Sequence, residues 1–74
     1  MSKLPVVSGR DLIKFLVEIG FEIKRQKGSH VFLKSHDNKF TTVPLQSELD
    51  RGTLGAILEQ IDIQRDDFIR LYKR

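Results

Sequence analysis

The 74-residue chain contains no cysteine and only two prolines. Without cysteine it can form no disulfide bond and no thiolate-held metal site, so its stability must come from packing. No apolar run approaches the ~20 residues of a membrane-spanning helix, and we expect no signal peptide. These absences exclude a disulfide scaffold and a transmembrane protein, and they favour a cytoplasmic location.

Several motifs that carry chemistry are also missing. The sequence has no His, Asp and Glu cluster at metal-ligand spacing, no Walker phosphate loop and no dinucleotide-binding glycine pattern. We therefore expect no metal and no small-molecule cofactor. The length predicts a single domain over residues 1–74, with a modest core that buries around 60% of the surface exposed by the unfolded chain.

Positive charge is concentrated in the first half of the chain. Residues 1–34 hold seven Lys or Arg against three acids, whereas residues 35–74 hold six against seven, within a net charge of +3. The densest basic stretch is 24–27, immediately before Gly28. Such a patch suits a polyanion, because binding to phosphates releases counterions. The alternative is an ordinary solvated strand.

The first part of the chain predicts an amphipathic helix over about 9–19. Ser8 and Asp11 have the spacing of a capping box, with Ser8 as the N-cap. Gly20 can end the helix, because glycine enters the left-handed conformation at low cost. The apolar residues at helical spacing are Leu12, Phe15, Leu16 and Ile19.

A period of two then replaces the helical period. Apolar and polar residues alternate over 21–24 and again over 30–34, with a tight connection at 27–29. Turn-forming residues occupy 35–39, and a third strand over 40–43 ends at the following proline. Three strands joined by short turns predict an antiparallel meander.

Two further helices are expected after a loop. Asp50 can cap the first of them, whose apolar face holds Leu54, Ile57, Leu58 and Ile61. The last helix, over about 64–72, is expected to bury Phe68, Leu71 and Tyr72. The order α-β-β-β-α-α predicts an α+β fold, with helices on one face of a three-stranded sheet.

The two histidines have different surroundings. His36 lies in the turn at 35–39, where a solvated turn residue is the simplest interpretation. His30 begins the second strand, on the same side as Lys34 and opposite to Val31 and Leu33. If those two apolar residues face the helices, His30 faces solvent.

An exposed histidine among cations has the composition needed to cleave RNA. The reaction deprotonates the 2′-hydroxyl and protonates the departing 5′-oxygen, and imidazole exchanges protons near neutral pH. Nearby cations or backbone amides can stabilise the added phosphate charge. The candidate RNA-binding residues are Lys24, Arg25, Lys27, Gly28, Ser29 and Lys34. The alternative is that His30 is an inert surface residue.

Several short segments resemble those of the HicA (YcfA-like) toxins, in their order and spacing over nearly the whole chain. These segments are Gly20-Phe21, Arg25-Gln26-Lys27-Gly28-Ser29-His30, Thr42-Val43-Pro44, Gly52-Thr53-Leu54 and Ile57-Leu58. The resemblance implies a fold like a double-stranded-RNA-binding domain. It also implies a type II toxin that cleaves mRNA without a metal, blocks translation and is neutralised by a HicB-type antitoxin. In that family the histidine of the Gly-Ser-His motif is catalytic, which implies this role for His30 and matches the motif glycine to Gly28.

The chain departs from the family pattern at two positions. Members often have a second histidine directly after the first, where this chain has Val31. Many also have a histidine two residues after the proline, where this chain has Gln46, which can form hydrogen bonds but cannot transfer protons at neutral pH.

Three functions remain open from the sequence. The first is an endoribonuclease toxin, the second a non-catalytic RNA-binding module, and the third an inactive toxin homologue that only binds an antitoxin. Double-stranded-RNA-binding domains hold phosphates with lysines at the start of their last long helix. Here that region, residues 50–53, has one cation and one acid, which argues against binding long duplexes in this way.

Overall fold

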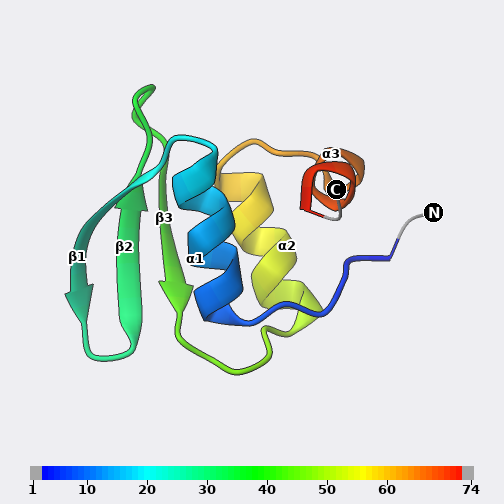
Figure 1. Cartoon of the computed structure of the whole chain (residues 1–74), viewed down its shortest axis with the longest axis horizontal. Coiled ribbons are helices and arrows are strands. Elements are labelled where there is room, and N and C mark those ends of the chain that lie inside the picture. Colours follow the sequence, from blue (N-terminus) through cyan, green and yellow to red (C-terminus); the bar gives the residue numbers. More distant parts are fainter. Residues whose placement is uncertain (1–2, 73–74) are drawn as a thin grey trace.

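The computed structural model describes residues 3–72. Its elements are α1 (Gly9–Glu18), β1 (Glu22–Lys27), β2 (His30–Lys34), β3 (Phe40–Pro44), α2 (Arg51–Gln60) and α3 (Arg65–Tyr72). The strands form one antiparallel sheet in the order β1-β2-β3, with helices packed against it (Figure 1). The predicted α+β fold is confirmed. Within residues 3–72, no helix has the length and apolar character needed to cross a membrane.

Side-chain hydrogen bonds cap the N-termini of α1 and α2, as expected. The Asp11 N–H donates to Ser8 Oγ at 3.0 Å, and the Thr53 N–H donates to Asp50 Oδ1 at 2.7 Å. The second bond holds the pKa of the Asp50 carboxyl below its ordinary value, since it favours the ionised form. The return bond from the Asp11 carboxylate is absent among the described residues, and this half of the predicted capping box is wrong. Capping boxes use the longer Glu or Gln at this position.

The sheet contains one irregularity, a β-bulge in β1. Ile23 pairs with Leu33 of β2 and Arg25 pairs with Phe32, so Lys24 is an extra residue without its own partner in the register. The alternation expected over 21–24 does not continue past Lys24. Beyond the bulge, the side chains of β1 face the side opposite to the one that simple alternation gives.

One face of the sheet carries the core. Val31, Leu33, Thr41 and Val43 are buried on the side that faces the helices. Thr41 Oγ1 donates to Gln60 Oε1 of α2 at 2.8 Å, which satisfies the buried hydroxyl. The other core residues are Leu4, Val7, Leu12, Phe15, Leu16, Phe21, Leu49, Leu54, Ile57, Leu58, Ile61 and Phe68. All four apolar residues expected on the inner side of α2 and its end are buried.

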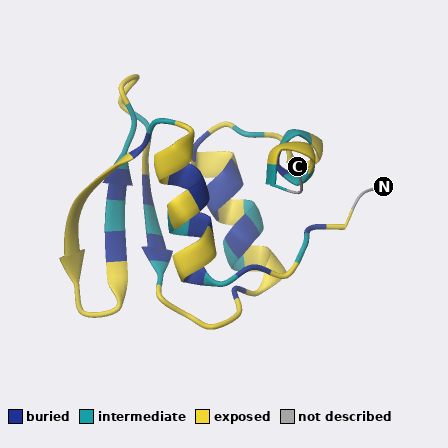
Figure 2. Cartoon of the chain, in the orientation of Figure 1, coloured by how far each residue is buried: buried dark blue, intermediate teal, exposed yellow. Residues whose placement is uncertain are grey.

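The strand β1 lies at the edge of the sheet, and all its residues are exposed (Figure 2). Its one large apolar residue, Ile23, is 53% exposed although its partner Leu33 is buried. The reason is position, since α2 packs on β3, at the opposite edge of the sheet, and α1 contacts β3 more than β1.

The helix α3 is held by aromatic contacts. Phe68 is fully buried and meets Phe15 of α1 edge-on, with ring centroids 5.1 Å apart. Tyr72 stacks on Phe68 at 5.2 Å, and its partial burial raises the pKa of its phenol. The expected burial of Leu71 is wrong. This side chain is 37% exposed, because the packed side of this final helix is the one that carries Phe68.

Candidate active site

A two-residue turn, Gly28-Ser29, joins β1 to β2 and presents His30. The residues on either side of it, Lys27 and His30, are register partners. Gly28 has a φ of +59°, and a Cβ there would meet nothing within 4 Å. Glycine is therefore needed for the backbone conformation and not for space, as at the first central position of a primed hairpin turn. Gln26 Nε2 donates to the Gly28 carbonyl at 3.0 Å and braces the turn.

Three segments meet at the end of the sheet that carries His30. The Leu45 N–H donates to the Ser29 carbonyl at 2.7 Å, and the Gly9 N–H donates to the Gln46 carbonyl at 2.9 Å. Gly9 leaves no room for a side chain, because a Cβ would lie 2.0 Å from the Pro44 carbonyl oxygen. The hairpin turn, the loop after β3 and the start of α1 thus converge (Figure 1). Gln46 lies in the loop at this end of the sheet.

The side chain of His30 is exposed on the side of the sheet turned away from the helices. Its neighbours in β2, Val31 and Leu33, are buried on the other side, so the orientation expected for His30 is confirmed. We call this side the outer face. Cross-strand partners share a face, and the paired residues of the outer face are therefore Glu22, Arg25, Lys27, His30, Phe32, Lys34, Phe40, Thr42 and Pro44. Lys24, which contacts Glu22, is added to them.

The β-bulge brings the cations of β1 to His30. Arg25 is opposite Phe32 and Lys27 is opposite His30, so Arg25 and Lys27 share a face, and that face is the outer one. Simple alternation along β1 puts Lys24 on the face opposite to that of Arg25 and Lys27. Lys24 is the extra residue of the bulge, and its Nζ contacts Glu22, an acid of the outer face.

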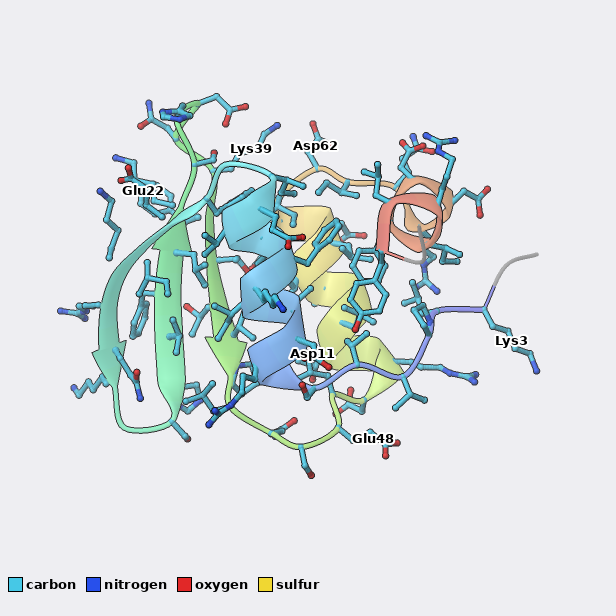
Figure 3. All side chains as sticks on the ribbon, in the orientation of Figure 1. Lys3, Asp11, Glu22, Lys39, Glu48 and Asp62 are labelled. Atoms are coloured by element: carbon cyan, nitrogen blue, oxygen red, sulfur yellow. The ribbon has the colours of Figure 1, made fainter. Side chains whose placement is uncertain are left out.

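The charges are distributed unevenly along the outer face. Lys24 Nζ lies 2.8 Å from Glu22 Oε1, and this contact lowers the pKa of the Glu22 carboxyl. Glu22 lies at the end of the sheet opposite to the hairpin turn (Figure 3). Toward the turn, the described outer-face residues with charge are the cations Arg25 and Lys27, beside His30. The half-buried Lys34 is opposite Glu22 and neighbours Phe40.

The second histidine, His36, is exposed in the turn between β2 and β3, at the far end of the sheet from His30. Asp37 in the same turn accepts from the Ser35 hydroxyl and lies 3.3 Å from Lys39, and both contacts lower the pKa of its carboxyl. Lys39 also lies 3.7 Å from Asp62, which ties the turn to the segment before α3 (Figure 3). His36 thus belongs to a structural turn, as expected.

Two features of the site had no clear sequence signal. The first is the bulge, which places Arg25 and Lys27 on the outer face. The second is Arg10, an exposed cation that directly follows Gly9 at the converging end. The sequence shows only that Arg10 lies near the start of a helix. It does not show which other segments that helix start will contact.

The outer face combines an exposed imidazole with exposed cations. An imidazole can accept and donate a proton, while cations stabilise an anionic group placed beside it. Fold and site therefore define a small α+β protein whose open sheet face is suited to a polyanion.

The chain belongs to the HicA toxin family. The family profile described as "HicA toxin of bacterial toxin-antitoxin" matches residues 9–63, from the start of α1 to beyond the end of α2. Membership implies an antitoxin as partner. A search of curated proteins finds no match to the chain.

Proposed function

We propose that this toxin is a metal-independent endoribonuclease that cleaves mRNA with His30 as its single catalytic histidine. The observation that carries the proposal is the exposed His30 at the start of β2, with Lys27 as its partner across the ladder. In the cleavage, the 2′-oxygen attacks the neighbouring phosphorus and the bond from phosphorus to the 5′-oxygen breaks. His30 exchanges the protons that these two oxygens lose and gain.

The residues around His30 would hold the phosphate and stabilise its transition state. Arg25 and Lys27 supply positive charge on the same face, and the Gly28 and Ser29 amides lie in the turn directly before the histidine. Lys34 and Lys24 would contact phosphates farther along the RNA. Lys24 contributes least, since its charge is offset by Glu22.

The loop after β3 supplies no second histidine. Gln46 is exposed at the end of the sheet that carries His30, and its backbone carbonyl is bonded to Gly9. Its amide can orient a phosphate through hydrogen bonds but cannot transfer a proton at neutral pH. In this proposal, His30 therefore accepts the first proton and returns it, or water takes one of the two transfers.

The antitoxin would be of the HicB type and would act by covering His30. A one-histidine enzyme is blocked most simply when that side chain is buried. An acidic partner would also associate faster with the cationic outer face. The toxin would act in the cytoplasm, where mRNA is its substrate, as part of a stress response.

The test compares His30→Ala with His36→Ala, since both histidines are exposed and lie at opposite ends of the sheet. We expect His30→Ala to lower RNA cleavage by purified protein by about 10²–10⁴-fold. It should also relieve growth arrest on regulated expression, with an unchanged melting temperature. His36→Ala should cleave like the parent. Equal cleavage by folded His30→Ala would remove His30 from the mechanism. Absence of cleavage by the parent would favour the RNA-binding module or the inactive homologue.

A further inference from the structure

Two phenylalanines lie on the outer face, where no helix covers them. Phe40 is 63% exposed, and Phe32 is half-buried. Each ring has a cation beside it, with Arg25 Cζ 4.9 Å from the centroid of Phe32 and Lys34 Nζ 5.2 Å from that of Phe40. Cations at these distances are attracted by the aromatic ring. The outer face therefore carries two pairs, each of an aromatic ring and a positive charge.

These pairs form a line that leads away from His30. Phe32 is two residues along β2, and Phe40 is the partner of Lys34, two residues farther. At a strand rise of ~3.3 Å per residue, the pairs lie about 7 Å and about 13 Å from His30 along the strand. A few linked nucleotides span this length.

We propose that the outer face binds an unpaired RNA segment along β2, with one base stacked at Phe32 and another at Phe40. This inference rests on the proposed function and names its substrate class, single-stranded RNA. Phe40 stacks a base directly. Arg25 already covers one side of Phe32, and its planar guanidinium offers its other side to a base. Lys27 and Lys34 contact the phosphates, and the strand leads to His30.

Charge and shape both favour unpaired RNA as the ligand of the outer face. Among the outer-face residues of the described chain, Glu22 is the one acid, and it is paired with Lys24. The face is therefore complementary to a polyanion. Paired bases in a duplex are stacked on each other and do not offer their faces to a flat sheet, whereas unpaired bases stack on aromatic rings. At the start of α2, the other place where a duplex could be held, the Asp50 carboxylate already accepts from the Thr53 N–H.

The experiment measures binding apart from cleavage. All variants carry His30→Ala, and affinity is measured by anisotropy for a labelled oligoribonucleotide, either unpaired or annealed to its complement. We expect Phe40→Ala to weaken binding of the unpaired RNA by about 5- to 100-fold and Phe40→Trp to retain it. Ile23→Ala is the matched control. Ile23 is a large exposed apolar residue of the same sheet, but it shares the face of Leu33, so its removal should leave binding unchanged.

Each outcome decides the question. Weaker binding in Phe40→Ala, with rescue by Trp and preference for unpaired RNA, supports the inference. Unchanged affinity in a folded Phe40→Ala, or equal affinity for the duplex, overturns it even if the parent protein cleaves RNA through His30. A change in oligomeric state with unchanged RNA affinity also overturns it and identifies the face as a contact between copies. If Phe40→Ala unfolds, Phe40→Leu keeps the apolar bulk, and the same comparison applies. Failure of the parent to cleave RNA would reject the proposed function independently, since binding is measured without cleavage.

Discussion

The two faces of the sheet are built from alternate residues of the same strands, yet their chemistry is opposite. In β2, Val31 and Leu33 face the helices and are at most 3% exposed, whereas His30 is exposed on the outer face. In β3, Thr41 and Val43 are buried, whereas Phe40 is 63% exposed. The buried residues of the inner face are apolar apart from Thr41, whose hydroxyl donates to Gln60. The outer face holds cations and two unburied aromatic rings.

This difference separates stability from function. Apolar area removed from water stabilises the fold at about 25 cal/mol per Å², and that area lies on the inner face. The outer-face residues add little to the core, so they are free to be selected for binding. We therefore expect inner-face substitutions to lower stability and outer-face substitutions to lower RNA binding or cleavage. The three predictions below test this division, from the largest expected effect to the smallest.

The largest effect is expected for Leu33→Ala on the inner face. Leu33 is 1% exposed, and its truncation leaves a cavity, so the free energy of unfolding should fall by about 2–5 kcal/mol. This is a large part of the ~4–11 kcal/mol typical of a domain of this size. Urea denaturation measures this free energy of unfolding. Ile23, the cross-strand partner of Leu33, is 53% exposed, and Ile23→Ala should lower the free energy of unfolding by well under 1 kcal/mol. Equal losses of stability in the two variants would show that the different burial of Leu33 and Ile23 does not determine their contributions to stability.

The inner face could be predicted from the sequence because it depends on local patterns. The alternation in 30–34 identifies its buried residues, and the helical spacing before Gly20 identifies Leu12, Phe15 and Leu16. The same spacing is wrong for Ile19, which is 39% exposed at the end of α1. Ser8 and Asp50 cap the helices through bonds to residues only three positions away. By contrast, nothing in the pattern before Ser8 indicated that Leu4 and Val7 join the core. Their burial depends on long-range contacts, such as the bond from the Leu49 N–H to the Val7 carbonyl at 2.8 Å.

The second effect is expected for the double variant Arg25→Ala and Lys27→Ala on the outer face. If both side chains contact phosphates of single-stranded RNA, the log–log salt dependence of binding should flatten by about 1.4 units. Stability should change little, because both residues are exposed. The matched control replaces Lys14 and Arg51, two exposed cations of α1 and α2. A salt slope that changes only in the control pair would place the RNA on the helices.

The outer face could be predicted only in part, and the bulge in β1 explains why. His30 follows from alternation in β2, so its exposure was expected. Simple alternation from Glu22 puts Arg25 on the side of Ile23, whereas the register puts it opposite Phe32. A bulge depends on the pairing of two strands, and the extra residue, Lys24, has no distinctive chemistry. The sequence therefore identified the cations but not their common face with the histidine.

The smallest effect is expected for Gly28→Ala in the hairpin turn between β1 and β2. The space around Gly28 is open, so the added methyl group causes no clash, and the cost is that of an alanine at a φ of +59°. That cost is about 1–2 kcal/mol, measured as a loss in the free energy of unfolding. Gly52→Ala is the matched control, because Gly52 lies within α2, where alanine is favoured, and its added Cβ would meet only an ordinary contact at 3.4 Å. This control should be neutral or stabilising. If both variants lost the same stability, the positive φ of Gly28 would not be the cause. If Gly28→Ala lost none, the turn would have relaxed, and the position of His30 would depend on its ladder partners Lys27 and Pro44 and not on the turn.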